Sequence, residues 1–135
     1  MNVQVAVLCD AATDENGKLS LLGAFDTIYA QHLPAVHPQC AVALRVTFAS
    51  TDEGPHKLKL NFINADGRAI MPAMEIPVTV TLPDDSHILT RNFIVNIQQL
   101  KFAEAGLYSI DVRLNDKSHV SIPLSVKNLP VRPAA

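Results

Sequence analysis

Hydrophobic and polar residues alternate along most of the chain, with a period of two residues rather than the 3.6 of a helix. The alternation is clearest in the segments 42–48 and 58–62, where Val, Leu and Phe are separated by Ala, Arg, Thr, Lys and Asn. Such a pattern places every second side chain on one face of a β-strand. Turn residues divide the pattern into eight expected strands: 3–9, 19–28, 42–48, 58–62, 76–82, 89–97, 108–114 and 120–126.

In the first expected strand, Val3, Val5, Val7 and Cys9 share one face. Short turns join several of the strands, and the Asn-Gly pair at 16–17 readily takes the positive φ angles of a tight hairpin. Residues 29–40 contain two prolines and show no clean period. We therefore expect a long connection there that crosses between sheets.

Two further segments depart from the simple pattern. Residues 100–106 are predicted to hold one helical turn, which Gly106 ends. Pro77 lies inside the segment 76–82, where it cannot donate a backbone hydrogen bond. Because a missing amide hydrogen is harmless at the border of a sheet, this segment is predicted to be an edge strand.

Eight short strands without a long helix predict an all-β fold, an antiparallel β-sandwich that is immunoglobulin-like or similar, with about eight strands. Residues 1–127 are expected to form a single domain, followed by a loose tail over 128–135. The following side chains are predicted to be largely buried: Val42, Leu44, Val46, Leu58, Leu60, Phe62, Tyr108, Ile110, Val112, Ile122 and Leu124.

One local motif sharpens the fold prediction. Gly106-Leu107-Tyr108 resembles the tyrosine corner of immunoglobulin-like folds, in which the Tyr hydroxyl bonds to the backbone of the preceding loop. We expect that bond to reach the backbone between residues 100 and 105. Ile110 stands where an antibody-type domain has its second cysteine, and the chain contains no Trp. The resemblance is therefore to sandwiches of this kind in general.

The net charge and the N-terminal residues indicate which partners and which cellular compartment to expect. A net charge of −2 gives no general attraction to nucleic acid or to an anionic membrane. No Lys or Arg precedes the apolar start, as it would in a signal peptide, so a cytoplasmic protein is expected. The uncharged stretch 27–44 contains Gln, His and Pro, which argues against a membrane span. Cys9 and Cys40 are then expected to be reduced thiols, with a disulfide between them as the alternative.

The His32-x4-His37-x2-Cys40 cluster is the one place where metal-ligand residue types lie close together in sequence. Its spacing matches none of the familiar zinc patterns, so we expect no metal there. Two solvated histidines and a buried thiol on a loop account for the cluster instead. His56, His87 and His119 fall near expected turns or strand ends, where exposed histidines are ordinary.

Carboxylates gather near expected turns, and aspartates on neighbouring loops could hold calcium weakly. The candidates are Asp10, Asp14, Glu15, Asp26, Asp52, Glu53, Asp84 and Asp85. The loop beginning at Asp14 lacks the repeated spacing of an EF-hand, and turn formation accounts for these acids. A calcium site would require the loops at residue 52 and at residues 84–85 to meet.

Motifs for catalysis are missing from the sequence. There is no Gly-x-Ser-x-Gly elbow and no glycine-rich phosphate loop, and Cys9 lies inside an alternating strand, where a structural thiol is expected. Lys57, Lys59 and Arg45 are expected on outward faces of the sheets. We therefore assign no catalytic residue, no cofactor-binding residue and no metal ligand, and we expect no cofactor.

These exclusions favour a non-catalytic protein-binding or assembly module. The expected partner is a protein, self-association included, and neither nucleic acid nor a membrane. Sheet edges and apolar faces are the expected routes to such a partner. The alternative is a small enzyme, or a weak calcium- or ligand-binding domain with its site on the loops of the sandwich.

Three stretches of the chain resemble a known family. They are 4–12 with 17–28, which includes Phe25-Asp26-Thr27-Ile28, then Glu53-Gly54-Pro55-His56, and finally 106–108 through 120–124. They are similar to a group of short, uncharacterised bacterial proteins treated as a domain of unknown function. The resemblance spans almost the whole chain and implies a bacterial β-sandwich that stands alone as a domain. It implies no activity.

Overall fold

Residues 1–129, which the computed structural model describes, form nine strands and one short 3-10 turn. The strands are β1 (Asn2–Glu15), β2 (Lys18–Phe25), β3 (Thr27–Ala30), β4 (Ala35–Ala49), β5 (Gly54–Asn64), β6 (Met74–Val80), β7 (Ile88–Phe102), β8 (Gly106–Leu114) and β9 (Lys117–Asn128). The 3-10 turn η1 (Ser50–Asp52) lies between β4 and β5. In this part of the chain, no helix has the length and apolar character needed to cross a membrane.

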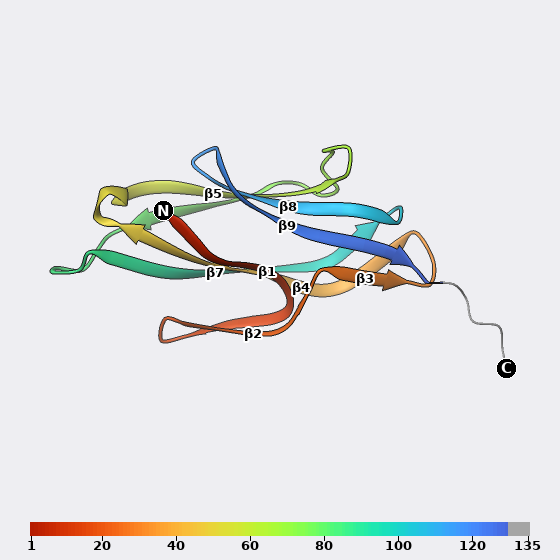
Figure 1. Cartoon of the computed structure of the whole chain (residues 1–135), viewed down its shortest axis with the longest axis horizontal. Coiled ribbons are helices and arrows are strands. Elements are labelled where there is room, and N and C mark those ends of the chain that lie inside the picture. Colours follow the sequence, from red (N-terminus) through yellow and green to blue (C-terminus); the bar gives the residue numbers. More distant parts are fainter. Residues whose placement is uncertain (130–135) are drawn as a thin grey trace.

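The strands build two sheets that pack face to face (Figure 1). The order in the four-stranded sheet is β2-β1-β4-β7, and in the five-stranded sheet it is β3-β9-β8-β5-β6. The predicted all-β sandwich is thus confirmed. One pairing differs from the prediction, because the short strand β3 runs parallel to β9, whereas the other neighbours pair antiparallel.

The main core lies between the two sheets and follows the predicted alternation. Val42, Leu44 and Val46 of β4 face Leu58 and Leu60 of β5 across the sandwich, and all five are buried. The other side chains predicted to be buried are also in this core, although Tyr108 is only half-buried at its border. Burial of this many apolar side chains is the main term that stabilises such a fold.

The expected strand 19–28 is two strands in different sheets. Asp26 separates β2, which ends at Phe25, from β3, which begins at Thr27. The Asp26 carbonyl accepts a hydrogen bond from the Ser125 N–H, which fastens the crossing point to β9 (2.8 Å). The Phe25-Asp26-Thr27-Ile28 stretch is therefore where the chain changes sheet, and this change of sheet leads into the parallel pair of β3 and β9.

The expected long connection over 29–40 is wrong, because only residues 31–34 lie between β3 and β4. β4 begins at Ala35 and continues through Pro38. The ladder to β7 pairs His37 with Leu100 and Gln39 with Gln98, so it passes over Pro38, which has no N–H to donate. The β3–β4 loop also contains the cis peptide bond between Leu33 and Pro34.

The helical turn predicted for 100–106 is wrong as well. β7 continues to Phe102, a bend follows over 103–105, and β8 begins at Gly106. Leu100 and Phe102 are buried in the main core, and the pairing of β7 with β4 extends to Phe102 and Ala35. Sheet pairing and burial therefore decide the conformation of a segment whose sequence alone allows a helical turn.

The first strand also differs from its expected facing. The register of β1 against β4 shifts between Val3 and Val5, so Val3 packs on the main core whereas Val7 and Cys9 face the other way. Leu8 takes the fully buried position instead. A β-bulge of this kind reverses which residues face the core, and the alternation of apolar and polar residues in the sequence does not reveal it.

The C-terminal strand reaches slightly further than expected. β9 includes Asn128, and the Leu129 N–H donates a hydrogen bond to the Ala30 carbonyl (2.7 Å). The predicted loose tail otherwise concerns residues 130–135, which lie outside the described residues.

Candidate functional site

The tyrosine corner is present as predicted. The Tyr108 hydroxyl donates a hydrogen bond to the Glu104 carbonyl (2.7 Å), inside the expected range of residues. The Tyr108 ring packs edge-on against Phe102, with 5.0 Å between ring centroids. Both ends of this side chain are thus used in holding the loop between β7 and β8, which is a structural role.

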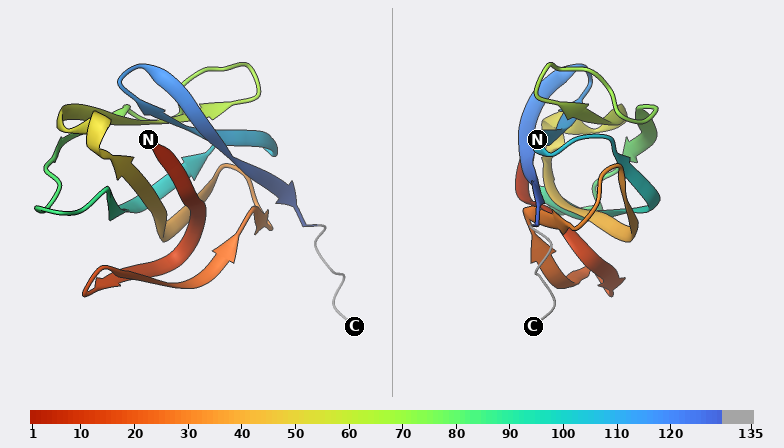
Figure 2. Two further views of the ribbon diagram at one scale, coloured as in Figure 1. Left: turned by 60° about the vertical axis from the view of Figure 1, so that its left-hand side comes forward. Right: turned by 90° about the vertical axis from the view of Figure 1, so that its right-hand side faces the viewer.

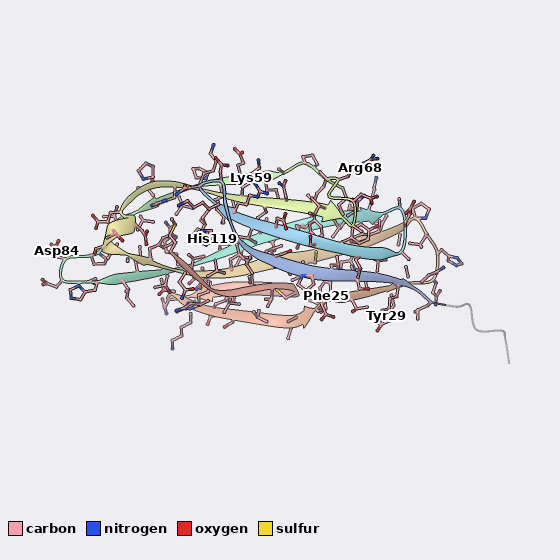
Figure 3. All side chains as sticks on the ribbon, turned by 45° about the horizontal axis from the view of Figure 1, so that its top comes forward. Phe25, Tyr29, Lys59, Arg68, Asp84 and His119 are labelled. Carbon is pink, nitrogen blue, oxygen red and sulfur yellow. The ribbon has the colours of Figure 1, made fainter. Side chains whose placement is uncertain are left out.

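A cavity of about 620 Å³ lies beside Tyr108 at one end of the sandwich. Its walls include the charged residues Asp66, Arg68, Lys101 and Glu104, and Figure 3 shows Arg68 toward this end of the molecule. The volume is in the range of ligand pockets. However, both charge signs are mixed on its walls, and the Tyr108 hydroxyl is already bonded to the loop, so the cavity presents no assembled catalytic set.

The His32, His37 and Cys40 side chains do not come together. Cys40 is buried in the main core, and burial raises the pKa of its thiol to about 11. His37 lies against the Phe25 ring, with 5.5 Å between ring centroids, while His32 is exposed on the β3–β4 loop. Across residues 1–129, no three His, Cys, Asp or Glu side chains are grouped so that they could hold a metal ion.

The loops that contain Asp52, Glu53 and Asp84 lie at the opposite end of the molecule, where Figure 3 labels Asp84. The Asp52 carboxylate accepts hydrogen bonds from the Ala49 N–H (2.9 Å) and from the amino group of Met1 (3.0 Å). These bonds lower its pKa, the Ala49 bond most. The Glu53 carboxylate accepts from the Leu82 N–H (3.1 Å). Both acids therefore serve as acceptors for the loop backbone.

Cys9 and Cys40 are free thiols on opposite faces of the four-stranded sheet. Cys9 pairs across the ladder with Ala41, and its thiol donates a hydrogen bond to the Ala41 carbonyl (3.5 Å). The alternative of a disulfide between them is thus wrong, because the thiols point to different sides of the sheet.

The basic residues divide into two groups. Lys57 and Lys59 lie on β5 as predicted, and both reach Glu75 of β6 at 3.6 and 3.9 Å across the outer surface. Arg45 is different, because its guanidinium donates to the Gly17 carbonyl (2.9 Å) and to the Asn92 side chain (2.8 Å). This side chain therefore connects β4 and β7 to the turn between β1 and β2.

The outer part of the β1–β2 hairpin, residues 11–22, folds under the four-stranded sheet, and we call it the hairpin arm (Figures 1 and 2). Its Ala12 and Leu19 side chains pack against a second cluster of fully buried residues on the outer face of the sheet, which comprises Cys9, Ala41 and Ala43. Asn92 donates from its amide group to the Asp14 carboxylate (3.1 Å) and to the Gly17 carbonyl (3.2 Å). Arg45 and Asn92 thus hold the tip of the arm.

The arm bends where β1 and β2 pass Asp10 and Gly23. Gly23 has a φ of 69°, and the Asp10 side chain occupies the space that a Cβ atom at this position would need. Only glycine combines this backbone conformation with such a close approach. The bend carries β2 to the border of the molecule, where Figure 1 shows it at the bottom.

The outer edge of β2 is an apolar sheet edge. Within residues 1–129, β2 pairs with β1 alone, and its sequence from Leu19 to Phe25 contains no charged residue and no proline. The Leu22 side chain is 71% exposed, and Leu21 is also exposed. An apolar strand edge with unpaired backbone groups readily pairs with another strand.

The other three edges are better protected. The predicted edge strand β6 is confirmed at the border of its sheet and contains Pro77, and β3 has only four residues. On β7, the Arg91 guanidinium donates across to the Thr79 carbonyl of β6 (3.2 Å). Gln99 adds a positive φ of 56°, which distorts that edge.

The sequence did not indicate the importance of β2 or of Arg45. The one available signal was Leu21-Leu22, two adjacent apolar residues that violate the alternation of a half-buried strand. Arg45 occupies an ordinary outward position, and only the fold brings the arm beneath it. The second cluster of buried residues could not be predicted for the same reason, because only the fold places the arm over it.

Two packed sheets, a tyrosine corner and an open apolar strand edge define the chain as a β-sandwich protein. The chain belongs to a family of unknown function, DUF6941, whose family model matches residues 4–127. That match runs from β1 to β9 and confirms the resemblance to a family of unknown function. A comparison with curated proteins finds no match.

Proposed function

We propose that this protein is a non-catalytic protein-binding module whose binding element is the outer edge of β2. The observation that carries the proposal is the combination of unpaired backbone groups and exposed leucines on a strand that contains no charged residue and no proline from Leu19 to Phe25. An extended segment of a partner would add a strand there, with backbone hydrogen bonds giving affinity and leucine contacts giving specificity.

The hairpin arm supports this function because it presents the edge on a fixed platform. The arm is packed on Cys9, Ala41 and Ala43 and is held at its tip by Arg45 and Asn92. An edge that is ordered before binding loses less conformational entropy when a partner pairs with it.

The proposal also includes an immunoglobulin-like topology and a cytoplasmic location. The tyrosine corner at the start of the penultimate strand supports the former. The two free thiols on opposite faces of one sheet support the latter, since reduced cysteines are usual in the cytoplasm.

The test is selection of short random peptides on the immobilised full chain, followed by measurement of their binding to variants. We expect the selected peptides to have alternating apolar residues and to lose at least tenfold in affinity for Leu22→Lys, because an edge lysine opposes strand addition. Ile88→Lys is the matched control, since Ile88 is similarly exposed at 63% but lies on β7. Equal binding to Leu22→Lys and wild type would contradict the proposal.

A further inference from the structure

We infer that the partner at the β2 edge is a second copy of this chain, paired antiparallel to the first about Leu22. The inference rests on the proposed function, because it names the occupant of the same edge. In this register, residues whose numbers add up to 44 lie opposite each other in the two copies. The two four-stranded sheets would then form one continuous sheet across the dimer.

Charge complementarity supports a second copy as the occupant. Lys18 and Asp26 stand four residues to either side of Leu22, at the two ends of the edge. Antiparallel pairing about Leu22 therefore places Lys18 of each copy opposite Asp26 of the other, twice by symmetry. Within residues 1–129, neither side chain has an ion-pair partner, and the Asp26 carboxylate accepts only from the neighbouring Thr27 hydroxyl (2.9 Å).

The apolar positions fit the same register. Leu22, the most exposed large apolar side chain within residues 1–129, meets its own copy at the two-fold axis. Leu21 lies opposite Gly23, which has no side chain, and half-buried Leu19 lies opposite half-buried Phe25. Directly opposed residues share one face of an antiparallel sheet, so these contacts form on both sides of it.

The arrangement predicts a weak dimer. The backbone ladder extends only from Leu19 to Phe25, because Asp26, opposite Lys18, lies at the bend where the chain leaves this sheet, and the bend at Gly23 interrupts its middle. The area that such a ladder buries is small compared with a permanent interface, and its end charges are exposed and screened by salt. We therefore expect a monomer–dimer equilibrium that depends on protein concentration.

The experiment is sedimentation velocity on the full chain over a wide range of concentrations, with wild type, Leu22→Lys and Leu22→Glu. Because position 22 faces itself, each variant alone brings two like charges together, and we expect each to be monomeric where wild type is dimeric. An equimolar mixture of the two variants should restore the dimer, since lysine then faces glutamate. Far-ultraviolet circular dichroism checks that both variants fold.

The register has its own test in Lys18→Glu, Asp26→Lys and the double variant that carries both. Each single reversal should weaken the dimer at low salt, and the double variant should recover it, because the opposite charges face each other again. Recovery by the double variant supports the pairing of residue 18 with residue 26. Failure to recover, with all variants folded, would overturn this register.

Two outcomes overturn the inference as a whole. One is a wild-type chain that stays monomeric at every concentration, and the other is a dimer that persists in both Leu22 variants. Neither outcome decides the proposed function. If peptides still lose binding to Leu22→Lys while the wild-type chain is monomeric, the edge binds a different partner. If no peptide depends on Leu22, the proposed function fails by itself.

Discussion

Tyr108 joins the penultimate strand to the loop before it through two separate contacts, the hydroxyl bond to Glu104 and the ring contact with Phe102. The two contacts differ in their surroundings. The carbonyl of Glu104 is near solvent, so water replaces part of a lost hydrogen bond there. The ring borders the main core, where removed volume is only partly refilled.

Substitution of this tyrosine separates the two contributions. Tyr108→Phe should lower the free energy of unfolding by about 1 kcal/mol, because the Glu104 carbonyl loses its partner. Tyr108→Ala should lower it by about 3 kcal/mol, because a cavity is added. Denaturant unfolding measures both values. A Phe variant as stable as wild type would show that the hydroxyl bond contributes nothing, and neither variant should change peptide binding.

Cys40 gives a pH-dependent prediction at the residue scale. Burial raises the pKa of its thiol to about 11 from 9.0, so the folded chain keeps this proton when the unfolded chain has lost it. The stability that follows is fully present below pH 9 and decreases as the pH rises toward 11. Between these values wild type should lose about 2 kcal/mol more than Cys40→Val, which has no thiol. Equal losses in urea titrations at pH 9 and 11 would contradict this prediction.

The hairpin arm is held against the sheet partly by polar contacts at its tip. Arg45 and Asn92 bind its tip, and the arm covers Cys9, whereas Cys40 lies on the other face of the sheet. Removal of both polar side chains should let the arm open without unfolding the sandwich, since the tip contacts are peripheral to the main core.

The double variant Arg45→Ala with Asn92→Ala should therefore react faster at Cys9. We expect the rate of alkylation by iodoacetamide to rise about tenfold, because loss of these hydrogen bonds costs about 1.4 kcal/mol of arm closure. Mass spectrometry of the peptides that contain Cys9 and Cys40 gives both rates from one sample. Equal acceleration at the two thiols would indicate global unfolding, and no acceleration at Cys9 would show that other contacts hold the arm.

At the element scale, the sequence predicted strands well where one face is buried and the other is wet. The segments around Leu60 and Val112 are of this kind, and each is a strand with those residues in the core. The segment around Leu44 is also a strand, although the hairpin arm buries Ala41 and Ala43 on its other face. The sequence predicted strand boundaries poorly where pairing between distant segments determines them. Pro38 lies inside β4 because the ladder passes over it, and the crossing at Asp26 follows from the position of β9 beside β3.

At the scale of the whole molecule, turn spacing and the missing long helices were sufficient to predict a sandwich. The candidate site could not be predicted in the same way. An edge exists only once the order of strands is known, and the order β2-β1-β4-β7 depends on contacts between residues far apart in the chain. Leu22 becomes an exposed edge residue through that order.

Hydrogen exchange of the backbone amides, followed by mass spectrometry with and without a selected peptide, tests the central claim most directly. The claim is that the outer edge of β2 binds a partner by strand addition. Slower exchange should appear in residues 18–25 when the peptide is bound, because their outward N–H groups become hydrogen-bonded. Unchanged exchange in β2, with protection appearing on β6 or around Tyr108 instead, would contradict the claim.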